Sequence, residues 1–353
     1  MKRDFNHIHG CLAGGAIGDA LGAPVEFMDY NTIIKKYGEM GITELVVPVV
    51  GQKAVITDDT QLTLFTAEGL LRSIVRTKQK NLEKTNKDTS IIVFRAYLRW
   101  LYTQGLKTPH WDSKSYDGWL VKVKRLHAYR EPGVTCITSL GKGVMGSINK
   151  PINDSEKCGG VIRVAPVGLL EDEENVFDVG CRIGAITHGH PTAYLSTGAL
   201  GTIIYYITEG LEIEEAVNKT IEKLMAYEGS GECIELIKMA VELSKQGEPG
   251  VDKIKQLGEG FIARETVAIG IYCALAYQDN FKKAVLLAVN HDGDSDSTGA
   301  VTGNILGAYL GMDKIDADLA GQIELAAEIK QISEDILTKY EEGEAWMKKY
   351  PGW

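Results

Sequence analysis

The sequence has no Cys-x-x-Cys pair, no long apolar run and no excess of positive charge. Its six cysteines are scattered, which is typical of reduced, mostly buried thiols in a cytoplasmic protein. A membrane-spanning helix needs about 20 consecutive apolar residues, and no segment approaches that length. The N-terminus also lacks the apolar core of a signal peptide. We therefore expect a cytoplasmic protein that does not act at a membrane.

The charge balance excludes another broad class of partner. The chain has 38 Lys and Arg residues against 48 Asp and Glu, which leaves a net charge of −10. Nonspecific binding to nucleic acid depends on Lys and Arg contacts to phosphates, so no nucleic-acid partner is expected. No linker rich in Pro, Gly or Ser and no internal repeat divides the chain. We predict one domain that covers residues 1–353, with a monomer as the favoured state.

An acidic stretch at residues 289–300 is the strongest chemical signal in the chain. It places Asp292, Asp294 and Asp296 on alternate positions and follows them with Ser297. Oxygen ligands of this kind suit hard cations such as Mg²⁺ or Mn²⁺. An EF-hand loop that begins at Asp292 is rejected, because its sixth position should be Gly and its twelfth Glu, but these are Ser297 and Gly303.

The same stretch matches the Asp-x-Asp-x-Thr motif of haloacid-dehalogenase-type phosphatases, at Asp294, Asp296 and Thr298. That interpretation requires a parallel sheet of alternating strands and helices. The periodic segments of this chain are instead helical, so the phosphatase is kept only as a distant alternative, one that predicts a phosphoenzyme at Asp294.

A second acidic pair lies at Asp58 and Asp59, between Thr57 and Thr60. These residues precede an amphipathic helix, and one acidic residue there is explained by helix capping. Two adjacent carboxylates are not, and the positive end of the helix dipole would keep both ionised. The pair is therefore a candidate metal-binding site.

Hydrophobic periodicity predicts about a dozen helices and no regular strands. One helix follows Thr57, one contains Leu325 to Ile336, and the others cover residues 8–23, 90–104, 118–129, 135–146, 177–187, 192–207, 211–227, 233–245, 264–277, 281–289 and 301–311. The predicted helix over residues 8–23 is rich in Gly and Ala, which indicates a central helix with close neighbours. Residues 78–88 are expected to form a polar loop, and the fold class is all-α.

Four further features need partners or ligands. Asp19 and Arg163 are charges in apolar surroundings, and each should be paired in a folded core. The loop at residues 153–160 ends in Gly159 and Gly160, whose backbone can approach a phosphate closely. His188, in a Thr-His-Gly-His-Pro segment, is expected to form hydrogen bonds in a pocket, because no Cys or further His lies nearby to complete a metal site.

Taken in order, these motifs resemble those of the ADP-ribosylglycohydrolase family. The resemblance spans residues 8 to 312 and includes residues 18–27 (Gly-Asp-Ala-Leu-Gly-Ala-Pro-Val-Glu-Phe), 57–60, 158–166, 187–191 and 293–300. It implies a compact all-α fold around two Mg²⁺ or Mn²⁺ ions in an ADP-ribose cleft. The metal ligands implied by the motifs are Thr57, Asp58, Asp59, Asp294, Asp296 and Ser297, where the family often has Thr at the last position. Whether Asp292 is an additional ligand is left open.

The resemblance also implies roles in substrate binding and catalysis. Glu26 would lie on a loop that approaches the substrate, Gly159 and Gly160 would line the diphosphate, and His188 would contact the substrate near the ribose. Phe261 is a further candidate, for stacking on adenine. The proton acceptor for an attacking water would be Asp58, Asp294 or Asp296.

The activity implied is removal of ADP-ribose from a modified protein side chain or a small ADP-ribosyl conjugate. Arginine linkage is favoured over serine, because residues 18–27 look like the bacterial type. A non-enzymatic alternative is a protein that binds ADP-ribose or a partner, such as an immunity protein that occludes an ADP-ribosylating toxin. Both acidic clusters are retained here, and a purely structural protein has no reason to keep such repulsive charges together.

Overall fold

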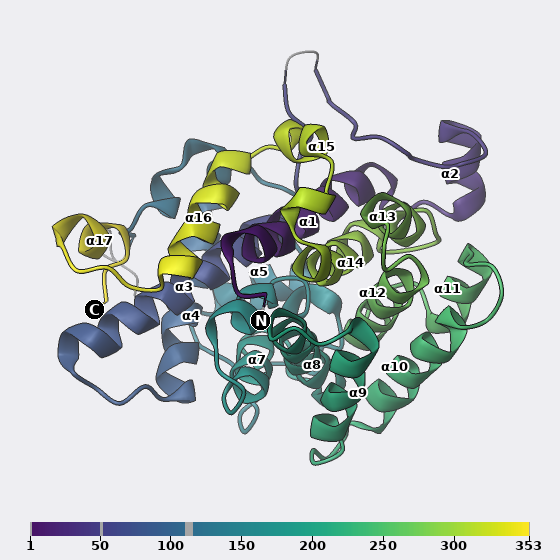
Figure 1. The fold of residues 1–353 in the computed structure, drawn as a ribbon. Coiled ribbons are helices and arrows are strands. Elements are labelled where there is room, and N and C mark those ends of the chain that lie inside the picture. The colour runs from purple at the N-terminus through teal and green to yellow at the C-terminus, as the bar shows by residue number, and fades with distance from the viewer. Residues whose placement is uncertain (1, 50–51, 110–115, 353) are drawn as a thin grey trace.

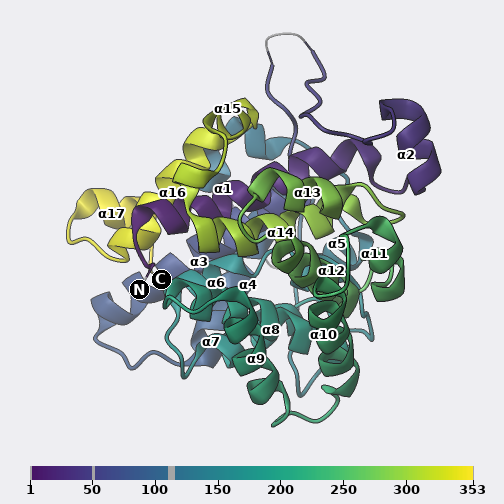
Figure 2. The same ribbon diagram turned by 45° about the vertical axis from the view of Figure 1, so that its right-hand side comes forward.

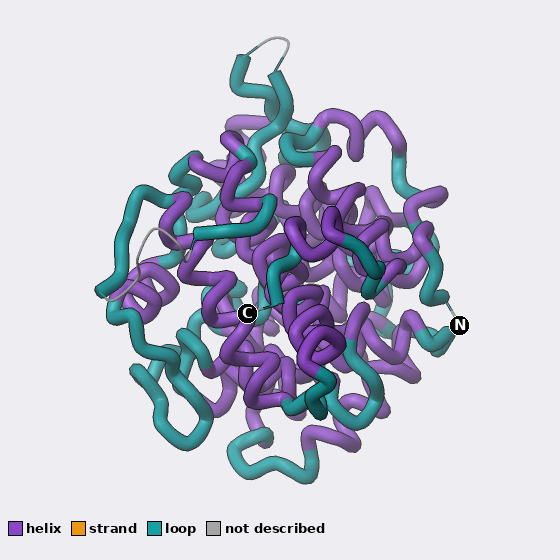
Figure 3. The backbone as a smooth tube through the Cα atoms, turned by 90° about the vertical axis from the view of Figure 1, so that its left-hand side faces the viewer, coloured by secondary structure: helices purple, strands orange, loops and turns teal. Residues whose placement is uncertain are grey.

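The computed structural model describes residues 2–49, 52–109 and 116–352, and in these ranges it is all-α. Figure 3 shows helices joined by loops, with no strand among the described residues. Only isolated β-bridges occur there, for example between Lys157 and Ile262. The predicted fold class is confirmed. The phosphatase interpretation was wrong, because the described chain has no parallel sheet to carry the motif.

The described residues contain seventeen α-helices and a few short 3₁₀ turns. The helices are α1 (Phe5–Gly22), α2 (Tyr30–Tyr37), α3 (Asp58–Lys80), α4 (Asn86–Thr103), α5 (Val134–Gly141), α6 (Ala165–Leu170), α7 (Val176–Ala185), α8 (Pro191–Thr208), α9 (Ile213–Leu224), α10 (Gly231–Ser244), α11 (Val251–Leu257), α12 (Ala263–Ala276), α13 (Phe281–Val289), α14 (Ser295–Leu310), α15 (Ala317–Gln322), α16 (Ala326–Thr338) and α17 (Glu344–Lys349). The 3₁₀ turns are η1 (Ala23–Val25), η3 (Leu120–Lys122), η4 (Lys124–His127), η5 (Cys158–Gly160) and η6 (Met312–Lys314).

Helices α1 and α14 form the central pair of the molecule, and they lie side by side in Figures 1 and 2. Glycines at every fourth position of α1 face glycines of α14 at very short range. A Cβ atom built on Gly18 would lie 2.0 Å from the carbonyl oxygen of Gly299, and one on Gly14 would lie 2.4 Å from that of Gly303. This close antiparallel contact brings the C-terminal end of α1 next to the first turn of α14.

Helix α3 is attached to the same pair through Asp19, which is fully buried in α1. The Asp19 carboxylate accepts hydrogen bonds from the backbone N–H groups of Thr57 (2.9 Å) and Thr60 (3.2 Å), and from the Thr60 hydroxyl. These donors belong to the first turn of α3, whose backbone N–H groups have no partners within the helix. The predicted need for a partner at Asp19 is thus met by the start of α3.

The remaining helices surround this centre. Helices α3, α4, α16 and α17 lie on one side of α1 and α14, and α9 to α12 lie on the other (Figures 1 and 2), while α2 stands at the periphery. No helix among the described residues is both long and apolar enough to cross a membrane. The six cysteines are free thiols, and all except Cys158 are buried.

Most long helices begin and end near the predicted positions, but five short helices were missed. Helices α2, α6, α11, α15 and α17 have six to eight residues each, too few for a clear periodic pattern. The loop expected at residues 78–88 is shorter, because α3 continues to Lys80 and α4 begins at Asn86. Helix α14 begins at Ser295 rather than near residue 301, which places Asp296 and Ser297 in its first turn.

The helix predicted over residues 118–129 was wrong. The structure has two 3₁₀ turns there, η3 and η4, separated by extended backbone at Val123. Gly118 has a φ of +94°, a conformation that ends regular helix. The Arg72 guanidinium fills the space beside it and donates to the carbonyl oxygen of Asp117 at 2.8 Å. The apolar residues that suggested a helix, such as Leu120 and Leu126, are buried by the two turns instead.

Candidate metal centre and ligand cavity

A cavity of about 330 Å³ opens where α1, α3 and α14 meet. Its lining includes all but one of the candidate site residues, namely Glu26, Thr57, Asp58, Asp59, Gly159, His188, Phe261, Asp294, Asp296 and Ser297. The exception is Gly160, which is buried behind the lining, where an added Cβ atom would meet the Thr197 hydroxyl at 2.9 Å. Pockets for small ligands typically occupy about 300–1,000 Å³, so the cavity has the size of a ligand site.

The two acidic clusters meet in this cavity. The Ser297 hydroxyl donates a hydrogen bond to Oδ2 of Asp59 at 3.1 Å, although the two residues are 238 positions apart in the chain. Each cluster begins a helix, since Asp58 and Asp59 open α3 and Asp296 lies in the first turn of α14. The positive ends of two helix dipoles therefore point at the carboxylates and partly offset their negative charge.

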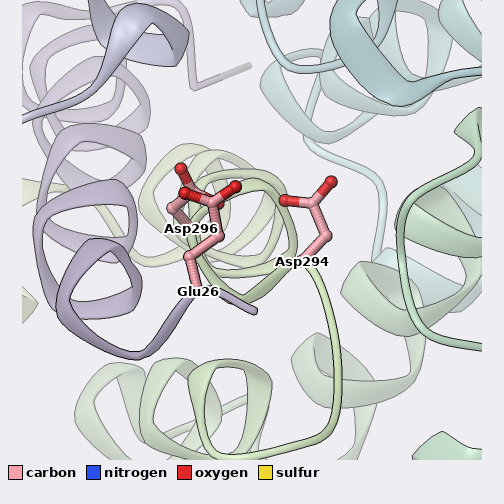
Figure 4. A group of neighbouring side chains, drawn as sticks. All are labelled: Glu26, Asp294 and Asp296. Carbon is pink, nitrogen blue, oxygen red and sulfur yellow. The ribbon is translucent and has the colours of Figure 1, made fainter. Parts of the chain in front are cut away.

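Glu26 approaches this meeting point from a third segment. It follows η1, just beyond the end of α1, and its side chain lies beside those of Asp294 and Asp296 (Figure 4). One carboxylate oxygen from each of these three residues lies within 4.8 Å of the others. The close packing of Gly22 against Ser295 and Asp296 brings the two segments to this distance.

Burial and mutual repulsion raise the pKa of four carboxyl groups of the cavity: Glu26, Asp58, Asp59 and Asp296. Burial, assisted by the charges of Asp294 and Asp58, raises the pKa of Glu26 to about 8. Burial raises the pKa of Asp58 to about 7, against a hydrogen bond from the Gly133 N–H that favours the charged form. The pKa values of Asp59 and Asp296 are held well above their usual range by burial and by neighbouring carboxylates. Without a cation, part of the cluster therefore keeps its protons at neutral pH. The expectation that the helix dipole keeps Asp58 and Asp59 ionised was wrong for the cation-free site, because burial outweighs the dipole.

The donor set fits a hard divalent cation. Carboxylate and hydroxyl oxygens are the ligands that Mg²⁺ and Mn²⁺ prefer. None of the ion pairs formed among the described residues involves Glu26, Asp58, Asp59, Asp294 or Asp296. Buried carboxylates that lack a cationic side chain need protons or metal ions to neutralise them, so the cluster could hold a metal.

Asp292 belongs to the same sequence motif but faces away from the cluster. Its carboxylate accepts a hydrogen bond from the Tyr30 backbone N–H and forms an ion pair with Lys255 at 3.1 Å. These contacts lower the pKa of Asp292 below its ordinary value. The structure therefore gives Asp292 a role in holding the loop before α14, outside the lining of this cavity.

Several cavity residues were missed by the sequence analysis. The Cys158 thiol donates to Oδ2 of Asp294 at 3.0 Å, a contact that the scattered spacing of the cysteines does not predict. Phe27 stacks on Phe261 with ring centroids 5.7 Å apart, and its φ of +62° is unusual for an aromatic residue. Because Phe27 is 69% exposed, neither its periodicity nor its burial could have marked it, although it directly follows Glu26.

The loop at residues 130–133, which contains Pro132 and Gly133, also borders the cavity. Arg130 forms two hydrogen bonds to the carboxylate of Glu324, which ties residues 130–133 to the segment between α15 and α16. The loop thereby places the Gly133 N–H 3.4 Å from Oδ2 of Asp58. Its sequence carries no signal of this role beyond the Pro-Gly turn.

The chain is similar to several known proteins over most of its length. It is 24% identical to the ADP-ribosyl-[dinitrogen reductase] glycohydrolase of Rhodospirillum rubrum, with 90% of each chain covered. It is 24% identical to the ADP-ribosylarginine hydrolase Tri1 of Serratia proteamaculans, covering 93% of this chain and 78% of that protein. An uncharacterised protein of Archaeoglobus fulgidus is 27% identical over 87% of this chain and 88% of its own length.

The fold and the family model agree with these similarities. The structure matches a solved structure titled ADP-ribosylglycohydrolase-related protein complex with a TM-score of 0.63, at 22% identity, over 96% of this chain and 99% of that one. The family model described as ADP-ribosylglycohydrolase matches residues 1–345. On this match, which covers nearly the whole sequence, the chain belongs to the ADP-ribosylglycohydrolase family.

Proposed function

We propose that this protein is a divalent-metal-dependent hydrolase that releases ADP-ribose from modified protein side chains, with arginine linkages preferred. The observation that carries the proposal is the meeting of Asp58 and Asp59 with Asp294 and Asp296 in one cavity, joined by the hydrogen bond from Ser297 to Asp59. Family membership supports hydrolysis of ADP-ribosyl linkages in general. The buried carboxylates supply the chemistry that such hydrolysis needs.

Six side chains are proposed to hold two Mg²⁺ or Mn²⁺ ions: Thr57, Asp58, Asp59, Asp294, Asp296 and Ser297. The chemistry that such ions supply when bound is Lewis-acid chemistry, by which ribose hydroxyls are oriented and the pKa of water is lowered. Thr57 already uses its hydroxyl to accept a hydrogen bond from the Asp59 N–H at 3.2 Å, which fixes the side chain at the start of α3. Ser297 similarly fixes the carboxylate of Asp59.

The carboxylates have a second task in the proposed reaction. Cleavage at the anomeric carbon of the ribose develops positive charge on the sugar ring, as in glycoside hydrolysis. Negative groups held in a buried cavity stabilise that charge more strongly than they would in water. The proton of the attacking water passes to one of Asp58, Asp294 and Asp296, and Glu26 contacts the substrate from the loop after η1.

The rest of the lining suits the remainder of ADP-ribose. Gly159 lines the cavity without a side chain, so its backbone can approach the diphosphate. The Phe261 ring lies in the same lining and can stack on adenine, while the Lys157 ammonium lies 5.4 Å from the centre of that ring and adds positive charge nearby. Gly160, outside the lining, acts through packing alone.

The arginine preference is supported by one relative, which is named an ADP-ribosylarginine hydrolase. The name of another relative specifies dinitrogen reductase as the modified protein but no linkage. The chain is also 22% identical to the mouse ADP-ribosylhydrolase ARH3, whose name specifies no linkage. A direct comparison of linkages is therefore the central experiment.

The purified protein should be incubated with arginine-linked, serine-linked and nucleotide-linked ADP-ribose conjugates, with and without Mg²⁺ or Mn²⁺, and free ADP-ribose measured. We expect release that requires the cation and is fastest from arginine. Release from no conjugate at any cation concentration would contradict the proposed hydrolase. In that case, saturable binding of ADP-ribose would identify a binding protein of the occluding kind.

A further inference from the structure

A line of buried polar groups leads from the core of the protein to one edge of the cavity. Arg163, Thr187 and His188 are 0%, 0% and 1% exposed, respectively. Nη2 of Arg163 donates to the Thr187 hydroxyl oxygen at 2.7 Å, and this oxygen lies 2.8 Å from Nδ1 of His188. His188 is the only member of the three that lines the cavity.

The direction of these hydrogen bonds follows from the chemistry of the groups. A guanidinium group can only donate, so the Thr187 oxygen must accept from Arg163. The single proton of the Thr187 hydroxyl has two possible acceptors, Nδ1 of His188 at 2.8 Å and the sulfur of Cys136. Because sulfur is a weak acceptor, we assign the proton to Nδ1 of His188. A neutral imidazole that accepts at Nδ1 carries its proton on Nε2.

The opposite side of the ring faces the cavity. A Cβ atom built on Gly159 would lie 3.0 Å from Cε1 and 3.2 Å from Nε2 of His188, so the ring lies directly against the Gly159 backbone. Among the hydrogen bonds of the described residues, none uses Nε2 of His188. The protonated nitrogen therefore has no acceptor in the described part of the protein and is free to bind an oxygen in the cavity.

Other contacts keep this arrangement rigid. The Thr187 carbonyl oxygen accepts from the side chains of Ser139 (3.1 Å) and Asn153 (2.8 Å), which fixes the backbone that carries His188. Arg163 is held in turn by the carbonyl oxygen of Ile183 at 3.3 Å, and its guanidinium lies 4.1 Å from the ring centre of Tyr97. Arg163 cannot turn without losing several contacts, and the backbone that carries His188 is fixed through the Thr187 carbonyl.

We infer that Arg163 and Thr187 are positioning residues that hold His188 as a neutral hydrogen-bond donor, with its Nε2 proton directed at an oxygen of the diphosphate or ribose beside Gly159. The identity of the ligand in this assignment rests on the proposed function. The tautomer of His188 does not, because it is argued from the hydrogen bonds alone. It excludes His188 as the base that activates water, because its cavity-facing nitrogen carries a proton.

The electrostatic surroundings agree with a neutral ring. Burial lowers the pKa of His188 to about 3, and the positive charge of Arg163 contributes in the same direction. His188 is therefore uncharged throughout the neutral range.

The tautomer can be read by ¹⁵N NMR of the full-length protein labelled at histidine, without ligand. We expect Nε2 of His188 to be protonated and Nδ1 to be a hydrogen-bonded acceptor, with no titration between pH 5.5 and pH 8. A proton on Nδ1, or a charged ring in that range, would overturn the inference. His188→Ala identifies the resonance.

Two matched pairs of variants test the contacts from Arg163 through Thr187 to His188. For each variant, the affinity for ADP-ribose is measured by calorimetry. Gln places an amide donor near the position of Nε2, whereas Asn places it near Nδ1. His188→Gln should keep affinity within about threefold of the unchanged protein, and His188→Asn should lose about tenfold, the effect of one hydrogen bond. Equal losses in both variants would contradict a donor at Nε2.

The second pair concerns the positioning residue. Thr187→Val keeps the shape but removes the hydroxyl, so the Nδ1 resonance should shift toward that of an unbonded nitrogen and affinity should fall about fivefold. Thr187→Ser should restore both readouts. Unchanged Nδ1 resonance in Thr187→Val would refute the role of Thr187, and if that variant does not fold, the His188 pair decides.

The two hypotheses fail in different ways. If the unchanged protein binds no ADP-ribose, the proposed function fails, while the tautomer measurement still stands. If ADP-ribose binds and is released from a conjugate but Nδ1 carries the proton, only the assignment of His188 is overturned.

Discussion

At the scale of single residues, the direction of a side chain separates Asp296 from Asp292. Both belong to the same acidic motif, but Asp296 lines the cavity among other carboxylates, whereas Asp292 pairs with Lys255. The pKa of Asp296 is raised because it is buried among like charges, and that of Asp292 is lowered by the hydrogen bond from the Tyr30 N–H and by its cationic partner Lys255. This contrast provides a matched control for the proposed chemistry.

Asp58→Asn and Asp296→Asn should each lower the rate of ADP-ribose release by at least about 100-fold, the usual range for loss of an acid–base or metal-binding group. Neither should unfold, because each removes one charge from a repulsive cluster. Asp292→Asn should retain activity within a few fold. The measurement is the initial rate at saturating Mg²⁺, with circular dichroism to confirm folding. Full activity in either cavity variant would refute the mechanism.

At the scale of secondary-structure elements, the contact between α1 and α14 sets the position of the whole acidic cluster. The glycines of α1 permit backbone contact with α14, and the sliding of one helix along the other would separate Glu26 from Asp294 and Asp296. The helix contact and the site are thus two consequences of the same spacing of small residues.

Gly18→Ala should destabilise the protein by about 2 kcal/mol or more, because the added methyl group would lie 2.0 Å from the carbonyl oxygen of Gly299 and must push the two helices apart. It should also weaken the binding of Mg²⁺. The matched control is Gly321→Ala in α15, where nothing lies within 4 Å of the new methyl group. Urea unfolding should show no loss of stability there, and equal losses in both variants would contradict the packing argument.

The junction of α1 and α3 depends on Asp19. Asp19→Ala would leave the backbone N–H groups of Thr57 and Thr60 without an acceptor in a buried position, which should cost about 2 kcal/mol or more of unfolding free energy. Asp19→Asn keeps one acceptor oxygen and should lose less. The unfolding free energies of the unchanged protein and the two variants should be compared by chemical denaturation. Equal values for all three would show that the hydrogen bonds from the start of α3 to Asp19 contribute nothing to stability.

At the scale of the whole molecule, stability should depend on pH in a way that a cation removes. Burial raises the pKa of Asp19 to about 6, and those of Asp58 and Glu26 reach about 7 and about 8. In the unfolded chain these groups titrate near pH 4. Between these limits the native state binds more protons than the unfolded state, so the stability of the cation-free protein falls as pH rises.

In EDTA, we expect the Tm of the protein to decrease steadily from pH 5 to pH 8.5. In excess Mg²⁺ or Mn²⁺, we expect the Tm to change much less with pH, because the charge of the bound cation replaces that of the protons. Glu26→Gln should flatten the EDTA profile at its upper end. The cation-loaded profile serves as the control, because all groups outside the cluster titrate in both. Parallel profiles with and without cation would show that the cluster binds no metal.

The all-α fold class could be predicted from the hydrophobic periodicity of the sequence, whereas the ends of several helices could not. Helices such as α8, α12 and α13 are long enough for their apolar periodicity to dominate, and their predicted bounds agree with the structure to within a few residues. The segment over η3 and η4 has the same kind of pattern, but the buried Arg72 beside Gly118 imposes two turns there. Such an effect comes from a neighbour in space, and no local pattern contains it.

The candidate site shows the same division. The acidic residues, the paired glycines and the Thr-His motif were visible in the sequence, because the chemistry of a residue is independent of its surroundings. The direction of Asp292 away from the cavity, the hydrogen bonds that Asp19 accepts from the start of α3 and the contact of His188 with the Thr187 hydroxyl were not. Residue identity and periodicity are local and can be read along the chain, but the direction of a carboxylate or an imidazole depends on partners that only long-range packing brings within hydrogen-bond distance.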